Sequence, residues 1–125
     1  MALMRSAPSY DAGLTTKIFI SGTKQPNLNS PSWCKWFLLD LVKEIRMTPV
    51  KGGGCEIQIP SPLGKSKSGV SATRIILESH VAIHTWPEQE ALRLLVDSCR
   101  EFDIDHLLRY LEYVFDTPRI VIRKS

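Results

Sequence analysis

Two neighbouring apolar segments constrain the fold of this chain more than any other feature of its sequence. VSATRIIL (70–77) and HVAIHTW (80–86) are rich in β-branched residues, and Pro87 follows the second segment. Such segments, separated by two residues, predict antiparallel strands joined by a tight turn. Both are apolar on both faces, so each face of the resulting sheet needs a cover. We expect helices on one face and a second subunit's sheet on the other.

The remaining strands and helices follow from short local patterns. Ser30 followed by Pro31 is typical of the start of a helix, and Asp103 can cap a second one. The segment 88–99 stays open, because its first half favours a helix and its second half fits a strand. The other expected elements are strands over 15–22, 55–59 and 119–123 and helices over 31–47 and 104–115.

Together these elements predict an α+β fold. It is a two-layer sandwich in which a mostly antiparallel sheet carries both helices on one face. The other face of the sheet is expected to pack against its copy in a dimer, sheet to sheet.

Length and composition indicate a single globular domain. The chain has 125 residues, of which 43% are hydrophobic and 23% are charged. We expect a flexible leader over residues 1–14 and one domain over 15–125. No apolar segment approaches the roughly 20 residues that cross a bilayer, and three widely spaced cysteines fit reduced thiols better than disulfides. These features predict a cytoplasmic protein that does not bind membranes.

Several kinds of ligand are disfavoured by the sequence. The net charge of +3 comes from scattered residues, whereas nucleic-acid recognition needs a basic stripe with interleaved aromatic residues. His80 and His84 would share a face only on a helix, and their β-branched neighbours indicate a strand. GKS at 64–66 lacks the earlier glycine of a phosphate-binding loop, since Ile59 stands there. We therefore predict no nucleic-acid partner and no metal.

Polar residues within the two predicted strands suggest a reactive site. With a turn at 78–79, Thr73 would face His84 and Ser71 would face Trp86 across the ladder. Ser71 and His84 would then lie on one face. A hydroxyl, an imidazole and the serine of the turn are the groups needed for acyl chemistry on a carbonyl. On these residues alone, chance polar positions at a hairpin remain an alternative.

The segment GVSATRIILESHVAIHTWPE (69–88) resembles the hallmark of the prokaryotic S-adenosylmethionine decarboxylases, a GVS followed by ESH-x-x-IHTWPE. SC at 98–99 resembles the TC of that family, whereas residues 1–68 match only in outline. The spacings between the four reactive residues also agree with the family: Ser71, Ser79, His84 and Cys99.

The resemblance implies an enzyme that cleaves itself. The backbone would break between Glu78 and Ser79, and Ser79 would become a pyruvoyl group. His84 would take the α-proton in the elimination that releases the first chain, and Ser71 would stabilise the intermediate. The pyruvoyl carbonyl would then act as the electron sink for decarboxylation, the role that pyridoxal phosphate fills elsewhere, so no metal and no pyridoxal phosphate would be required.

The resemblance also assigns roles in the decarboxylation itself. Cys99 would return a proton to the substrate carbon after carbon dioxide leaves. Glu88 would hold the ribose hydroxyls, for which carboxylate oxygens are suitable acceptors. Trp86 matches a family tryptophan and would serve either binding or packing. His80 and Thr85 would be structural supports.

The chain departs from the family at two positions near the expected site. Lys65 stands where the family carries an aromatic residue that stacks on the adenine, so Lys65 is a candidate substrate-binding residue with an altered role. Arg100 replaces the usual glycine. The adenine part of the substrate is therefore left open.

Three functions follow from this comparison. The leading one is an S-adenosylmethionine decarboxylase that supplies aminopropyl groups for spermidine. The second is a pyruvoyl-dependent decarboxylase of ornithine or arginine. The third is a catalytically silent paralogue that regulates a true decarboxylase. For an enzyme, we expect a small-molecule substrate and a homodimer of processed protomers.

Overall fold

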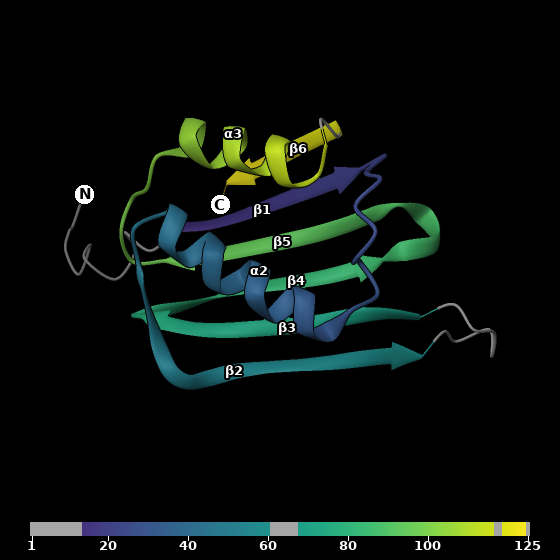
Figure 1. Cartoon of the computed structure of the whole chain (residues 1–125). Coiled ribbons are helices and arrows are strands. Elements are labelled where there is room, and N and C mark those ends of the chain that lie inside the picture. Colours follow the sequence, from purple (N-terminus) through teal and green to yellow (C-terminus); the bar gives the residue numbers. More distant parts are fainter. Residues whose placement is uncertain (1–13, 61–67, 117–118, 125) are drawn as a thin grey trace.

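The computed structural model describes residues 14–60, 68–116 and 119–124, which form one antiparallel sheet and one layer of helices (Figure 1). The predicted leader lies almost entirely outside the described residues, as does Lys65. In chain order the elements are β1 (Leu14–Ser21), α2 (Pro31–Glu44), β2 (Thr48–Pro60), β3 (Ser68–Leu77), β4 (Ser79–Trp86), the short 3-10 helix η1 (Pro87–Gln89), β5 (Ala91–Ser98), α3 (Ile104–Val114) and β6 (Arg119–Lys124).

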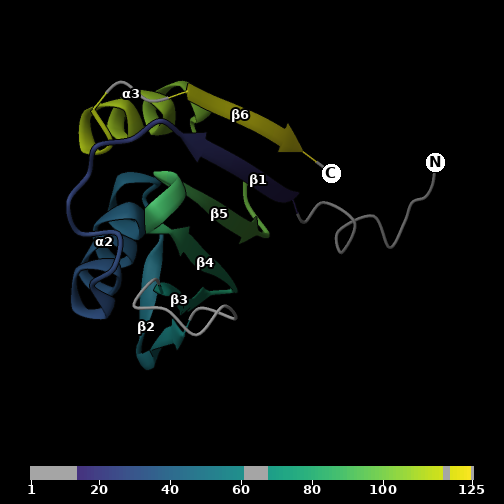
Figure 2. The same cartoon turned by 90° about the vertical axis from the view of Figure 1, so that its right-hand side faces the viewer.

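All six strands belong to one sheet with the order β2-β3-β4-β5-β1-β6, and every neighbouring pair is antiparallel. Both helices cover the same face, as Figure 2 shows with the sheet turned on edge. Helix α2 crosses the middle of the sheet and α3 lies beside β1 and β6 (Figure 1). The predicted α+β fold class is confirmed. The packing of two sheets in a dimer stays a prediction.

The helices begin where the sequence indicates. The Ser30 hydroxyl accepts a hydrogen bond from the Trp33 N–H, and the Asp103 carboxylate accepts one from the His106 N–H, so each side chain satisfies a free donor of the first turn. The apolar faces of both helices then pack on the sheet. Fully buried side chains of this core include Ile18, Leu41, Val42, Val81, Ile83, Leu94, Val96, Leu107, Leu111 and Phe115.

The segment 88–99 contains no α-helix. Of the two alternatives left open for this segment, the helix is therefore wrong and the strand is confirmed. The single turn of η1 ends at Glu90, which has a left-handed backbone conformation with φ of 53°. The strand β5 follows, and its buried positions alternate with half-buried ones. Because alternate side chains of β5 fill the core beneath the helices, strand burial outweighs the helix propensity of EQEAL.

The connection between β3 and β4 differs from the predicted turn by one position. Ile76 pairs with Ser79, so Leu77 and Glu78 form the connection and Ser79 begins the strand. As a result, Ser71 pairs directly with His84, and the predicted pairing of Thr73 with His84 is wrong. The error arises because a shift of two positions leaves every side chain on the same face, so the apolar pattern cannot detect it.

The strand at 55–59 is longer than predicted and includes the glycines before it. Strand β2 begins at Thr48, and its pairing with β3 shifts between Pro49 and Gly54. A Cβ at Gly54 would lie 2.7 Å from the guanidinium of Arg74. Gly54 therefore makes room for a buried arginine, at a position before the predicted start of the strand.

The face of the sheet that the helices leave uncovered is strongly apolar. Exposure of its large apolar side chains ranges from 38% for Phe19 to 57% for Leu77. The others on this face are Ile57, Ile59, Ile75, Trp86 and Val121. An apolar surface spread over five of the six strands fits the expectation that a second sheet covers it. Among the described residues, no helix is long and apolar enough to span a membrane.

Candidate active site

Ser71 and His84 form the most clearly defined polar pair on the uncovered face. They lie directly opposite each other on β3 and β4, and the Ser71 Oγ is 2.8 Å from the His84 Nδ1. Both side chains are half-buried. A serine hydroxyl bonded to an imidazole can pass a proton to it or stabilise a developing negative charge. The sequence-based prediction that these residues share a face is confirmed.

The backbone around this pair is held by a buried threonine. The Thr85 hydroxyl accepts a hydrogen bond from the Val70 N–H (2.8 Å) and donates one to the Leu28 carbonyl (2.7 Å). Gly69 approaches so closely that a Cβ there would overlap the Thr85 carbonyl oxygen. The glycine of the GVS motif is therefore required by packing between β3 and the end of β4. Thr85 acts as the structural support that the resemblance implied.

His84 lies in an environment that favours its neutral form. Burial lowers the pKa of the His84 imidazole below its ordinary value, and the positive charge of Arg93 lowers the pKa further. Arg93 is half-buried on β5, directly opposite His84. A neutral imidazole can accept a proton, so His84 is suited to act as a general base near neutral pH.

Glu78, Ser79 and Cys99 form a second cluster at the other end of β4. The Cys99 Sγ is 2.9 Å from the Glu78 carbonyl oxygen, to which the thiol donates a hydrogen bond, and 3.9 Å from the Glu78 Oε1. This carbonyl belongs to the peptide bond that joins Glu78 to Ser79. Cys34, by contrast, is buried in the core, where burial raises the pKa of its thiol to about 12 and makes it unreactive.

The loop after β5 is fixed on both sides of Cys99. The Ser98 hydroxyl donates to the Arg100 carbonyl (2.6 Å) and accepts from the Arg100 N–H (2.9 Å). The Arg100 guanidinium donates to the Arg46 carbonyl at 3.1 Å. Arg100, the residue that replaces a family glycine, thus ties the Cys99 loop to the end of α2.

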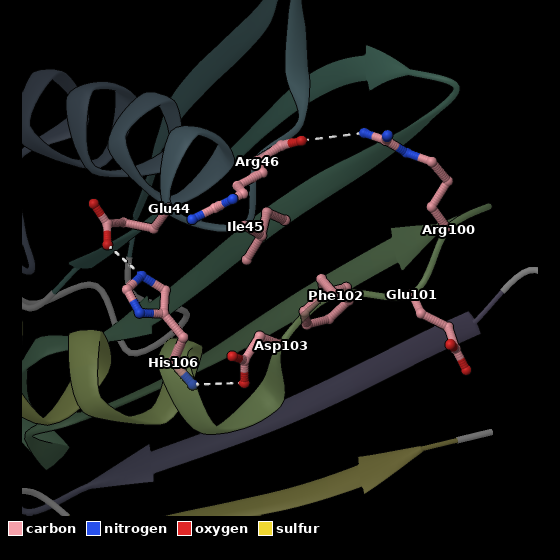
Figure 3. A pocket seen from close by; sticks show the side chains of 8 residues that line it. All are labelled: Glu44, Ile45, Arg46, Arg100, Glu101, Phe102, Asp103 and His106. Carbon is pink, nitrogen blue, oxygen red and sulfur yellow. Dashed lines mark hydrogen bonds and ion pairs between the residues drawn. The ribbon is translucent and has the colours of Figure 1, made fainter.

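Figure 3 shows the hollow that this contact borders. It has a volume of about 470 Å³ and lies between the end of α2 and the start of α3. The His106 Nε2 lies 2.9 Å from the Glu44 Oε1 across it. None of the predicted site residues is among its lining residues, which are Glu44, Ile45, Arg46, Arg100, Glu101, Phe102, Asp103 and His106.

The two polar clusters do not meet within one chain. Ser79 and His84 are five positions apart on β4, which corresponds to about 17 Å along an extended strand. Proton transfer requires heavy atoms about 3 Å apart. In the described conformation, His84 therefore cannot reach Ser79 of its own chain.

The remaining predicted residues lie around these clusters. Trp86 is half exposed on the face that carries His84, and Glu88 is exposed in η1. The His80 Nδ1 lies 3.6 Å from the Asp97 Oδ2 on the uncovered face. Within the described residues, no three His, Cys, Asp or Glu side chains are grouped as metal ligands.

Comparison with known proteins identifies the family of this chain. The sequence profile of the family described as S-adenosylmethionine decarboxylase matches residues 18–125, which is most of the chain. The chain belongs to the S-adenosylmethionine decarboxylase family. The four residues predicted to be reactive, Ser71, Ser79, His84 and Cys99, all lie within the matched range.

Relatives named for two different substrates are similar to this chain. The S-adenosylmethionine decarboxylase proenzyme of Pyrococcus abyssi is 37% identical over 62 residues, which cover 50% of this chain and 45% of the relative. The arginine decarboxylase proenzyme of Caldivirga maquilingensis is 37% identical over 67 residues, which cover 50% of each chain. The chain thus spans about half the length of the relatives it matches.

The fold of the chain is also similar to a solved member of the family. The crystal structure of the adenosylmethionine decarboxylase from Aquifex aeolicus matches with a TM-score of 0.67 and 22% identity, over 90% of this chain and 88% of the other. At this identity the comparison supports the fold alone.

Arg93 is the residue near the site that sequence analysis missed. A charged residue in the apolar segment ALRLLVDS was a usable signal, because burying a charge is costly without a partner. Its position beside His84 depends on the pairing of β4 with β5, which a single sequence does not reveal.

The electrostatic effect of Arg93 on His84 can be measured directly. In Arg93→Gln the pKa of His84 should rise, because removing a positive charge favours the imidazolium, and it should stay below about 6.5 because burial still disfavours that form. NMR titration of the ring signals, assigned with His84→Ala, gives both values. Ser79→Ala in every variant keeps the chain intact, and Arg119→Gln is the control. An unchanged His84 pKa in Arg93→Gln would contradict the assignment.

Proposed function

We propose that this chain is the proenzyme of a pyruvoyl-dependent decarboxylase, with S-adenosylmethionine as its substrate in spermidine synthesis in the cytoplasm. The observation that carries the proposal is the contact of the Cys99 thiol with the Glu78 carbonyl at 2.9 Å. The carbonyl of the bond proposed to be cleaved thereby lies next to a proton donor, and Ser79, the proposed nucleophile, is the next residue in the chain. Membership of a family with decarboxylase proenzymes supports the same reading.

Self-cleavage would begin at this contact. The Ser79 hydroxyl attacks the Glu78 carbonyl carbon, and the Cys99 S–H donates to the carbonyl oxygen as negative charge develops there. The C–N bond then breaks, which leaves Glu78 attached to Ser79 as an ester. A base removes the α-proton of residue 79, the Glu78 carboxylate leaves, and water releases ammonia to give a pyruvoyl group at the start of the second chain.

The residues present fit such a group. A ketone next to an amide carbonyl supplies an electron sink for the loss of carbon dioxide from an amine substrate. Cys99, exposed beside position 79, would return a proton to the substrate carbon. Glu88 and Trp86 would contact the nucleoside, with Glu88 accepting from the ribose hydroxyls.

The active site would be completed by a second copy of the chain. His84 is suited to be the base for the α-proton, yet it lies about 17 Å from Ser79 along β4. Sheets that pack face to face are about 10 Å apart, so residues on the facing sheet are close enough. We therefore expect a homodimer in which Ser71 and His84 of one protomer serve Ser79 and Cys99 of the other.

A free amino acid is the second candidate substrate. The resemblance to the arginine decarboxylase proenzyme is as high in identity as that to the S-adenosylmethionine decarboxylase proenzyme. The sequence also carries Lys65 in place of the aromatic residue expected to stack on adenine. Arginine or ornithine would use the same pyruvoyl group.

Self-cleavage tests the proposal first. The purified chain should split into residues 1–78 and a second fragment whose mass corresponds to a pyruvoyl start at position 79. Ser79→Ala should remain intact, because the nucleophile is lost, and the exposed Ser21→Ala should cleave normally. Denaturing gels and intact mass spectrometry measure both outcomes. A chain that folds and stays whole would instead favour the silent paralogue.

Mixing two inactive variants tests the shared site. His84→Ala should cleave about 100-fold more slowly or worse, as expected for loss of a general base, and Ser79→Ala should not cleave. When the two are unfolded together and refolded, a mixed dimer contains one complete pair of Ser79 and His84, so the His84→Ala chain should be cleaved. No cleavage above that of His84→Ala alone would place both residues in one protomer.

Substrate choice is decided by carbon dioxide release from the processed protein. We expect S-adenosylmethionine to give the highest kcat/KM in a parallel assay with ornithine and arginine, because Glu88 and Trp86 provide nucleoside contacts that the free amino acids cannot use. Glu88→Gln should weaken this preference. A higher value for arginine or ornithine would establish the second candidate.

A further inference from the structure

Charges on the uncovered face of the sheet are distributed unevenly. Asp97 is the only acidic residue in the described parts of β1, β3, β4, β5 and β6. The basic residues on the uncovered side of these strands are Lys17, Arg93, Arg119 and Arg123. A face that becomes covered can keep its charges only where opposite charges meet, because burying an unpaired charge is costly.

Arg93 is the basic residue that most needs an opposite charge when the face is covered. It lies in the middle of the sheet beside His84, is already half-buried, and makes no hydrogen bond or ion pair with any residue that the structure describes. A covering sheet would remove the water that now solvates its guanidinium. A carboxylate must then be supplied by the covering surface.

Cross-strand pairing arranges the relevant side chains in three rows on this face, because directly opposed residues share a face. The first row contains Ser71, His84 and Arg93, the second Thr73, Ala82 and Leu95, and the third Ile75, His80 and Asp97. The second row lies midway between the other two. Ser79 and Cys99 flank the third row.

The shared active site fixes how two such faces can meet. A two-fold axis between stacked sheets runs either along the strands or across them. An axis along the strands places each row over the same row of the partner. His84, in the first row, then stays far from the partner's Ser79, which flanks the third row. An axis across the strands, over the second row, places the first row over the third row of the partner.

We propose that the dimer is held in this register by two symmetric ion pairs, each between Arg93 of one protomer and Asp97 of the other. The inference rests on the proposed function, since the shared site orients the axis. With the axis across the strands, β5 lies over β5 of the second copy, and Arg93 and Asp97 are placed symmetrically about Leu95. A long arginine and a short aspartate can bridge a gap of about 10 Å between sheets.

The centre and edges of the face fit this arrangement. Ala82, on the axis row, is small and buried, which permits close contact between the copies. On that row Arg123 lies on the edge strand β6, and Lys17 lies beside it on β1, one strand in from the edge. Its flexible stem can carry the ammonium out to solvent, so the repulsion between two copies is reduced there.

Charge reversal and exchange test the ion pair. Arg93→Asp and Asp97→Arg should each raise the dimer dissociation constant by about tenfold or more, because like charges then face each other. The double variant Arg93→Asp/Asp97→Arg should restore association, since the charges are exchanged and the geometry is kept. Arg119→Asp, on the same face but at the edge strand, is the matched control and should associate as the parent does.

Sedimentation velocity on intact chains measures these constants, with Ser79→Ala in every variant so that association is independent of cleavage. Circular dichroism verifies that each variant is folded. The inference is overturned if the double variant associates as weakly as the single ones, or if the single ones associate as tightly as the parent. Cleavage is scored separately, on the parent chain that keeps Ser79. If the dimers depend on these charges and that parent never cleaves, the proposed function alone is refuted. If the parent cleaves and the charges have no effect on association, the ion pair alone is refuted.

Discussion

The Thr85 hydroxyl is the interaction on which the position of the candidate site depends. It links three parts of the chain, because it accepts from the Val70 N–H on β3 and donates to the Leu28 carbonyl in the segment before α2. All three groups are buried. Leaving either backbone group without a partner would cost about 1–3 kcal/mol. The neighbouring Ser71 and His84 are therefore presented in one fixed register, with the 2.8 Å contact already formed.

The two faces of the sheet differ in their side chains and in what they contact. One face forms the core together with the helices, and most of its buried side chains are apolar. The other combines exposed apolar side chains with polar groups that include Ser71, His84, His80 and Asp97. An apolar surface of this extent is typical of an association site, and covering it would also enclose the polar groups on the same face. Burial of apolar area and exclusion of water from the chemistry would thus come from a single association.

Local sequence signals predicted the elements well where one side chain decides the outcome. Ser30 and Asp103 each mark a helix start because capping depends on a hydroxyl or carboxylate at one position. Local signals were insufficient where contacts between residues far apart in the sequence determine the structure. The strand at Ala91–Ser98 depends on burial beneath the helices, and the register of β3 with β4 depends on which residues close the turn. Arg93 was missed for the same reason, since β5 brings it to His84 only through the sheet.

The two polar clusters lie at opposite ends of β4, although the short segment 69–88 contains most of the residues predicted to be reactive. In an extended strand, five positions carry Ser79 and His84 about 17 Å apart, too far for one to act on the other. In the proposed dimer, a two-fold axis across the strands would reverse the strand direction of the second copy and bring its Ser79 over His84 of the first. In the proposed dimer, a single β-hairpin would supply the bond to be cleaved, the base and the stabilising hydroxyl. Each hairpin would present the Glu78–Ser79 bond to one of two equivalent sites and His84 to the other.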